Sequence, residues 1–476
     1  MTNMESSILL EVKETLSRLL SKYSSNVNYL EVKASLSYGL SVNVENGVLK
    51  GLSRSDGIIV GVRALVKGSW GVSFTDMVSE EEFEKVFKRA VSSARALSTR
   101  VKGEVKLSEE KVYTDAKVRD VEKKFEDIDV EDKLNLVFQL DKGVRGYDKR
   151  IVNCRASYFE GYGEKIFLNS EGADIYQKYP LVFLFALVIA READKTQLTY
   201  DVIGGQYGYE KIEELDVNEF SEKLGKEVVE LLSAETIKGG TMTVVMDGRV
   251  SGTFAHEVFG HAAEADNVLN AKSFLSGLIG KKIGSDLVTI VDDATVPGAY
   301  GSFFYDDEGV PAQRKHLLEK GVLKTYMHNR ETAGLMSVKS TGNGRAQSPG
   351  SRIYVRMTNT FIAPGDWNPD EIIEETKHGV YVAKALGGME DPVGGGFQVS
   401  ALKAWLIEKG ELTKLLRAVS ISGKALDILK NIDAVGKDFV LEPGTCGKGY
   451  AGDMVPVTTG GPTVRVSEMI VGVGGR

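Results

Sequence analysis

The spacing of hydrophobic residues changes several times along the first half of the chain. Residues 5–22 carry apolar side chains at helical spacing, which predicts an amphipathic helix at the start. Residues 29–74 change to two-fold spacing, which predicts strands. Turn-forming dipeptides divide this stretch at Asn46-Gly47, Asp56-Gly57 and Lys67-Gly68. A helix followed by hairpin-connected strands is therefore expected.

Further helices and strands complete this half. Ser79 with Glu82 forms a capping box, which predicts a helix to about Ser98. Helical spacing returns over 130–144 and 217–233, and strand spacing covers 151–202. The ten-residue apolar run Leu181–Ala190 is too short to span a bilayer and predicts a buried strand or strand pair. The pattern indicates an α+β domain, an antiparallel sheet with covering helices.

The second half of the chain has a different pattern, in which strands and turns predominate. Lys238-Gly239-Gly240 is the preferred boundary, dividing the chain into an amino-terminal α+β domain over 1–237 and a β-rich domain over 238–476. Residues 242–246 predict a strand leading into a helix with two histidines. The remainder predicts strands and turns, with helices over 368–375 and 423–431. The expected fold class is α+β throughout.

Composition narrows the function classes. The 59 basic and 67 acidic residues give a net charge of −8, without a basic stripe, so we expect neither a nucleic-acid partner nor a membrane one. The start of the chain lacks the features of a signal peptide. Two cysteines, Cys154 and Cys446, cannot form a disulfide framework and fit a reducing compartment. We expect a cytoplasmic protein.

Glycine is unusually frequent, with 52 residues, and much of the excess lies in the second half. Tight β-turns are one explanation. The other is close approach of backbone to backbone, as in a cleft that holds an extended peptide. Gly394, Gly395 and Gly396 are the substrate-binding candidates on the second view.

One segment carries candidate chemistry, His256-Glu257-Val258-Phe259-Gly260-His261. Two histidines and a glutamate are typical of catalytic zinc sites, in which a carboxylate accepts a proton from water. The usual helical spacing of the histidines is four, whereas here it is five, and a straight α-helix would turn the rings about 140° apart. A π-bulge eased by Gly260 would restore convergence. The alternative to a zinc site is that both histidines lie on the exposed surface of a helix and bind no metal.

A zinc site needs a third protein ligand, and the sequence offers two. Cys446 lies in an exposed-looking glycine-rich turn beside Lys448, which would favour the thiolate. Glu264 follows His261 by three residues but must reach back along a distorted helix. We predict Cys446 as the ligand and Glu264 as a group that orients a histidine. Cys154, His316, His328 and His378 are expected to be structural or surface residues.

The second half resembles the TldD/PmbA family of bacterial and archaeal proteases, in particular the TldD branch. The resemblance spans roughly residues 240–465, and the first half is similar more loosely, through Gly57–Phe74. The matching stretches are residues 256–261, Asp306-Asp307-Glu308-Gly309, Ser340-Thr341-Gly342-Asn343-Gly344-Arg345, Arg356-Met357-Thr358-Asn359-Thr360, Gly394-Gly395-Gly396-Phe397-Gln398-Val399 and Cys446-Gly447-Lys448. The sequence departs from the family pattern at Gly388–Pro392.

The resemblance implies one zinc ion per chain, held by His256, His261 and Cys446, with Glu257 as the catalyst. It also implies unstructured peptides as substrates, bound as an added strand, and a PmbA-type (TldE) partner or a second copy of the chain. Asn343 and Arg345 join the three glycines as candidates for substrate contact.

A second function class remains open. A PmbA-type subunit shares the fold without the zinc motif, so the chain could be a non-catalytic binding or assembly subunit. The intact set of His256, Glu257, His261 and Cys446 favours the enzyme. Regulation of DNA topology, a third class associated with the family, is disfavoured by the acidic balance.

Overall fold

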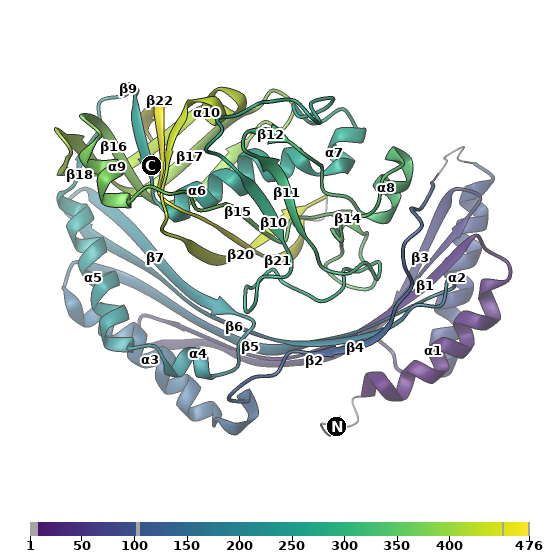
Figure 1. Cartoon of the computed structure of the whole chain (residues 1–476). Coiled ribbons are helices and arrows are strands. Elements are labelled where there is room, and N and C mark those ends of the chain that lie inside the picture. The colour runs from purple at the N-terminus through teal and green to yellow at the C-terminus, as the bar shows by residue number, and fades with distance from the viewer. Residues whose placement is uncertain (1–7, 101–104, 450–451, 475–476) are drawn as a thin grey trace.

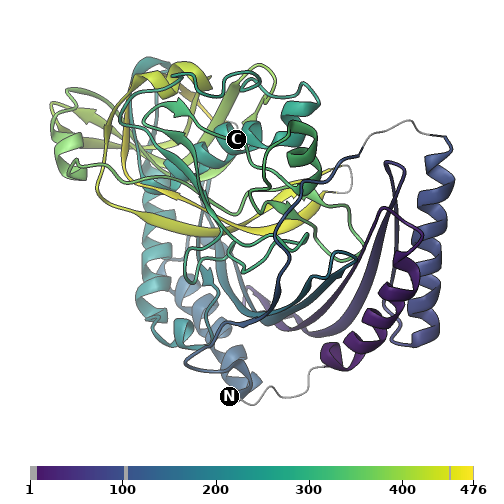
Figure 2. The same ribbon diagram turned by 45° about the vertical axis from the view of Figure 1, so that its right-hand side comes forward.

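The computed structural model describes residues 8–100, 105–449 and 452–474. The chain is an α+β protein, as predicted. A long, curved sheet from the first half wraps around a compact β-rich second half (Figures 1 and 2). None of the described helices has the length and apolar character needed to cross a membrane.

The sheet of the first half has seven strands in the order β3-β2-β1-β5-β6-β4, with β7 also pairing β6. Its strands are β1 (Tyr29–Glu45), β2 (Val48–Val66), β3 (Ser69–Thr75), β4 (Thr114–Val118), β5 (Ile151–Asn169), β6 (Asp174–Glu192) and β7 (Lys195–Gly205). All pairings are antiparallel except β4 with β6. The Asn46-Gly47 and Lys67-Gly68 hairpin turns are confirmed, and all four residues have positive φ.

Helices cover the convex face of this sheet in two groups (Figure 1). They are α1 (Ile8–Ser24), α2 (Glu80–Ser98), η1 (Phe125–Asp127), α3 (Val130–Tyr147), α4 (Glu210–Glu213) and α5 (Val217–Ser233). Residues 5–7 of the predicted first helix lie outside the described residues. The apolar stripe of α1, including Leu9, Leu16 and Leu20, is buried, as its spacing predicts.

One detail of the prediction was wrong. Asp56-Gly57 is not a turn but lies within β2, where Gly57 pairs with Ser37 of β1. The strand is exposed on both faces there, so its residues are polar and the local sequence is typical of a turn. The prediction of a strand for the apolar run Leu181–Ala190 is confirmed: the run is part of one strand, β6, whose side chains alternate between buried and half-buried because the second half covers its other face.

The second half contains a seven-stranded sheet, in the order β19-β22-β9-β16-β17-β18-β8, and a six-stranded sheet, in the order β12-β11-β10-β15-β21-β20. Because β22 also pairs with β18, five strands of the first of these form a closed ring of pairings. The first sheet contains β8 (Glu235–Thr236), β9 (Gly240–Met246), β16 (His378–Glu390), β17 (Gly396–Glu408), β18 (Glu411–Lys424), β19 (Ile432–Val435) and β22 (Val464–Val473). The second contains β10 (Ile290–Asp293), β11 (Arg314–Glu319), β12 (Val322–Leu323), β15 (Asn359–Ile362), β20 (Val440–Lys448) and β21 (Asp453–Gly461).

The remaining elements are short. They are the strand pair β13 (Gly344–Arg345) and β14 (Tyr354–Val355), and the helices α6 (Gly248–Thr253), η2 (Phe254–Gly260), η3 (His261–Ala263), α7 (Ala265–Leu269), α8 (Arg330–Met336), α9 (Pro369–Glu374) and α10 (Ala425–Asn431). The two helices predicted near 368–375 and 423–431 are confirmed, and α8 was not predicted.

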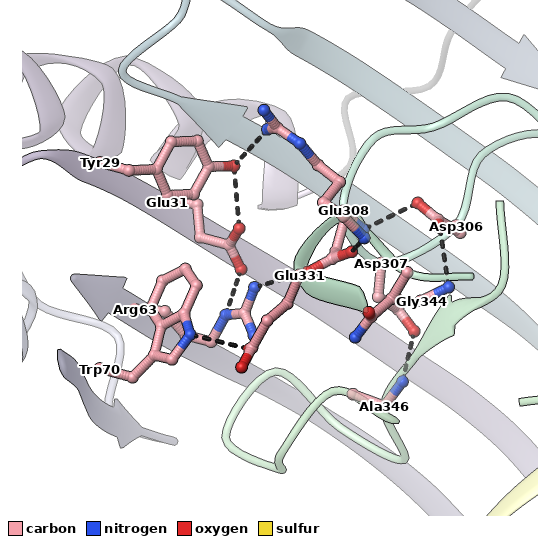
Figure 3. A network of polar contacts seen from close by, with 12 residues as sticks. Tyr29, Glu31, Arg63, Trp70, Asp306, Asp307, Glu308, Glu331, Gly344 and Ala346 are labelled. Carbon is pink, nitrogen blue, oxygen red and sulfur yellow. Dashed lines mark hydrogen bonds and ion pairs between the residues drawn. The ribbon is translucent and has the colours of Figure 1, made fainter. Parts of the chain in front are cut away.

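A buried polar network joins the two halves (Figure 3). Arg63 of β2 donates from Nε to Glu31 at 2.7 Å and from a terminal nitrogen to Glu308 at 3.1 Å. Trp70 of β3 donates to Glu331 at 3.1 Å. Breaking a buried pair of this kind leaves an unpaired charge and costs several kcal/mol, about 3–5. The network therefore fixes the second half against the concave face of the sheet.

Candidate metal centre

The histidine segment begins where β9 ends. Asp247 caps α6 by accepting from the N–H of Val250 at 2.8 Å. The helix then packs very closely on β21, because a Cβ added at Gly252 would lie 2.4 Å from the backbone nitrogen of Gly460. Glycine at this position lets backbone approach backbone. The contact sets the direction in which the next turn leaves α6.

That next turn is a π-helix, Phe254–Gly260, so the predicted distortion is confirmed. The N–H of His261 donates to the carbonyl of His256, five residues back. The wider turn brings the two imidazole rings together, with centroids 5.2 Å apart and planes at 83°. A π-helix therefore does for a five-residue spacing what an α-helix does for four.

Gly260 serves packing and not the bend itself. Its φ of −59° and ψ of −52° are ordinary helical values open to any residue. A Cβ at this position would lie 2.0 Å from the sulfur of Met357. The expectation that Gly260 eases the distortion is corrected: it makes room for a buried methionine.

Cys446 reaches the histidines from the other sheet. The prediction of an exposed turn was wrong, because Cys446 lies in β20 and is only 4% exposed. Its sulfur is 3.7 Å from Nε2 of His261. One candidate ligand atom from each of His256, His261 and Cys446 lies within 4.8 Å of the others. The structure thus gathers His256 from the π-helix, His261 from the residue that follows it, and Cys446 from a strand remote in sequence.

Glu264 supports one of the histidines. It is fully buried, and its Oε2 lies 3.2 Å from Nδ1 of His261, the ring nitrogen that faces away from the thiol. Lys448 donates to the same oxygen at 2.9 Å and to Asp266 at 2.7 Å. Burial alone would raise the pKa of Glu264, but the charges of Lys448 and His261 outweigh it and lower that pKa to about 2. Glu264 is an ionised acceptor that fixes the ring orientation of His261.

The thiol of Cys446 is also biased toward its charged form. Burial alone would raise its pKa, but the hydrogen bonds and charges of His256 and His261 outweigh burial and lower that pKa to about 4. Lys448, expected from the sequence to act on the thiol, instead directs its ammonium toward Glu264, Asp266 and the carbonyl of Val355. The imidazoles, not the lysine, favour the thiolate.

Two further carboxylates lie beside the histidines. Oε2 of Glu257 is 3.7 Å from Nε2 of His261, and the Glu257 side chain is 28% exposed. Glu390, at the end of β16, places a carboxylate oxygen within 4.8 Å of Glu257 and His261. Burial raises the pKa of Glu390, and the opposing charge of His261 offsets it only in part. Sequence reasoning missed Glu390, although the Gly388–Pro392 departure from the family pattern marked its position.

The other candidates are distributed as follows. Asn343 is fully buried, with its amide bonded to Asp292, Thr341 and the carbonyl of Arg356, so no group is left for substrate. Residues 394–396 form the turn before β17 and its first residue, and Gly395 is buried. Arg345 lines a cavity described below.

The remaining histidines and cysteine lie apart from this cluster. His316 and His378 are exposed, and His328 is 3% exposed in the core. Cys154 is fully buried in β5, and burial raises the pKa of its thiol to about 12. Both observations agree with the structural or surface roles expected for these residues.

The donor set fits a zinc ion. Two imidazoles and a thiolate are ligands that zinc prefers, and three protein ligands leave an open coordination position. The buried Nδ1 of His256 forms no hydrogen bond with any described residue, so the ring has a free polar atom in a dry setting. A partly exposed carboxylate, Glu257, stands beside the donors. Such an arrangement is suited to metal-assisted hydrolysis.

Comparison with protein-family models matches most of the chain. Residues 239–473 match the PmbA/TldA metallopeptidase C-terminal domain. Residues 123–234 match the central domain of the same metallopeptidases, and residues 30–94 match their domain 1.

Individual relatives agree over nearly full length. A metalloprotease from Methanocaldococcus jannaschii is 38% identical, over 92% of this chain and 96% of its own. A zinc metalloprotease TldD homolog from Saccharolobus solfataricus is 31% identical, over 90% of this chain and 91% of its own. The crystal structure of TldE from Thermococcus kodakarensis has the same fold, with a TM-score of 0.76, 21% identity and coverage of 97% and 100%.

Proposed function

Because the chain belongs to the PmbA/TldD family of metallopeptidases, we propose that it is a zinc-dependent peptidase. His256, His261 and Cys446 hold one zinc ion per chain, and Glu257 is the general base. The observation that carries the proposal is the convergence within 4.8 Å of three candidate ligand atoms, from the π-helix, the residue that follows it and a strand. Curated relatives named metalloproteases support the peptidase activity.

The roles of the residues follow from their surroundings. Zinc bound here would supply Lewis acidity that activates water and polarises the scissile carbonyl. Glu257 accepts the proton of the attacking water, because its carboxylate lies beside His261 and is open to solvent. Glu264 holds Nδ1 of His261, which keeps Nε2 directed toward the thiol side.

The proposed substrates are unstructured peptides bound as extended strands. Beyond Val382, β16 pairs only with β17 among the described strands, so residues 385–390 have one edge without a strand partner. This edge adjoins the catalytic glutamate, since a Cβ added at Gly388 would lie 3.1 Å from Cγ of Glu257. Strand addition reads main-chain groups and so tolerates many sequences. A folded domain should resist cleavage, whereas a destabilised variant of that domain should be degraded.

The proposed partner is a TldE-like subunit or a second copy of the chain, in the cytoplasm. The fold shared with TldE from Thermococcus kodakarensis is compatible with such a pair. It also motivates the second candidate function, a non-catalytic subunit with the same architecture.

Metal analysis of the purified protein separates the two functions. The peptidase predicts about one zinc per chain, loss of casein hydrolysis on chelation and recovery when zinc is restored. A chain that binds no zinc at neutral pH, and degrades no unfolded protein with or without it, is the non-catalytic subunit.

A further inference from the structure

A cavity of about 210 Å³ lies between the concave face of the first-half sheet and the second half. Its walls come from β1, β5 and β6 on one side, and from residues 300–307, 345–349 and 454–456 on the other. Aromatic side chains, Tyr179, Tyr300 and Phe303, form part of the lining. Of the candidate site residues considered above, Arg345 alone lines this space.

Lys33 contributes a buried ammonium to the cavity lining. Its side chain is 5% exposed, and Nζ forms no hydrogen bond with any described residue. The nearest carboxylate oxygen belongs to Glu31, at 3.7 Å. That carboxylate already accepts from Arg63 at 2.7 Å and from Tyr29 at 3.0 Å. Lys33 therefore has charge nearby but no hydrogen-bonding partner, which is unfavourable for a buried cation.

Arg345, on the opposite wall, is a second cation without a carboxylate partner. It is 7% exposed, and its terminal nitrogens donate to the carbonyls of Met357 at 2.6 Å and Pro456 at 2.7 Å. No ion pair to Arg345 occurs among residues 8–100, 105–449 and 452–474. Its guanidinium stacks 5.4 Å from the ring centre of Phe303.

The acidic groups of the lining are already engaged. Asp307 accepts from Lys165 at 2.9 Å and from the N–H of Ala346 at 2.8 Å, the latter drawn in Figure 3. Glu164 pairs with Lys178 at 2.8 Å. Asp306 accepts from three backbone N–H groups, those of Glu308, Val310 and Gly344. The lining thus retains two cations, Lys33 and Arg345, whose charged groups donate no hydrogen bond to a carboxylate of the described residues, Glu31 at 3.7 Å from Lys33 being the one ion-pair contact.

The cavity lies close to the candidate metal centre. Val455 belongs to its lining and is the register partner of Cys446 in the β20–β21 pair. Side chains of antiparallel partners lie about 5 Å apart. An extended peptide advances about 3.4 Å per residue. A peptide at the metal centre therefore needs only a few residues to reach the cavity.

We propose that this cavity binds a carboxylate carried by the peptide substrate, between the ammonium of Lys33 and the guanidinium of Arg345. A carboxylate can accept from both cations, and the aromatic walls suit its hydrocarbon portion. A phosphate dianion fits less well, because the carboxylates of Asp307 and Glu164 also line the space. The carboxylate comes either from an acidic side chain or from the C-terminus of the peptide. The inference rests on the proposed function for the peptide alone, because binding needs no hydrolysis.

Equilibrium binding to the full-length Glu257→Gln variant tests the proposal. Three fluorescent peptides of otherwise neutral sequence are compared by anisotropy: one with a free C-terminal carboxylate, one amidated, and one amidated with an internal glutamate. Charge-assisted hydrogen bonds predict at least about tenfold tighter binding for one or both carboxylate peptides than for the neutral one. The peptide that gains affinity identifies the source of the carboxylate.

Variants assign the effect to the cavity. Lys33→Met should remove most of the carboxylate preference, Arg345→Lys should reduce it, and Lys50→Met, at an exposed site on the same sheet, should leave it unchanged. In Lys33→Met the carboxylate of Glu31 keeps its hydrogen bonds from Arg63 and Tyr29, so we expect the variant to fold, and circular dichroism checks this. Equal affinity for all three peptides, or a preference that survives both cavity variants, overturns the proposal. A carboxylate preference in a chain that binds no zinc would contradict the peptidase but not this inference.

Discussion

At the scale of single residues, most groups of the candidate site could be predicted from the sequence, and one could not. The histidines, Glu257 and Cys446 could be selected from residue type and family resemblance. Glu390 could not, because its place beside Glu257 depends on how a bulged strand of another segment crosses the site. The predicted effect of Lys448 on the Cys446 thiol was wrong for the same reason. Lys448 is close to Cys446 in sequence, but its ammonium binds Glu264.

The first prediction tests the roles of Cys446 as a zinc ligand and of Glu264 as the group that orients His261. Cys446→Ala should lose most of the bound zinc, because two imidazoles alone bind zinc weakly at this site. Glu264→Ala should keep zinc with about 10–100-fold weaker affinity, because it removes only the support of His261. Metal content after dialysis, with circular dichroism as the folding control, measures both. Zinc retained without Cys446 and lost without Glu264 would reverse the assignment.

His328 provides a prediction about pH. Burial lowers the pKa of His328 to about 4, below the value of about 6.5 for an unfolded chain. Between these values the unfolded state binds the extra proton, so stability is lost as the pH falls from 6.5 toward 4. His328→Gln should reduce the loss in free energy of unfolding between pH 6.5 and 5 by about 1.5 kcal/mol.

Urea unfolding at the two pH values measures this effect. His316→Gln is the matched control, because His316 is exposed and its replacement should leave the pH dependence unchanged. An identical pH dependence in wild type and His328→Gln would exclude His328 as a contributor.

At the scale of elements, periodicity predicted most of what local physics determines. The spacing of apolar residues located α1, α3 and α5, whose buried stripes match it, and the capping box at Ser79 located α2. The five-residue histidine spacing predicted the π-helix, because convergence of the rings requires the wider turn. The turn at Asp56-Gly57 was wrongly predicted because the exposed first half of β2 lacks the alternation of apolar and polar residues typical of a half-buried strand.

The contact between α6 and β21 makes the element-scale prediction. In Gly252→Ala the added methyl would lie 2.4 Å from the nitrogen and 2.6 Å from the Cα of Gly460, and backbone cannot rotate away. We expect a loss of about 1–3 kcal/mol in unfolding free energy, with weaker zinc binding as the π-helix shifts. Gly240→Ala is the control, since a Cβ there meets nothing within 4 Å. Equal stability of the two variants would show that the close packing is unimportant.

At the scale of the whole molecule, the sequence predicted two halves of different character but not how they meet. The wrapping of the long sheet around the second half depends on pairings such as Arg63 with Glu308, which lie far apart in the chain (Figures 1 and 3). The domain boundary at residue 238 stays a prediction. The strand β8, just before it, already pairs with β18 of the second half, whereas the matched domains divide between residues 234 and 239.

The central claim is that Glu257 works on water beside a zinc ion that it does not hold. The most direct measurement determines zinc content and casein hydrolysis together in Glu257→Gln and in wild type. The account predicts equal zinc, about one per chain, and a rate lower by about 10²–10⁴, because a general base has been removed. Near-normal hydrolysis by the zinc-loaded variant would contradict it.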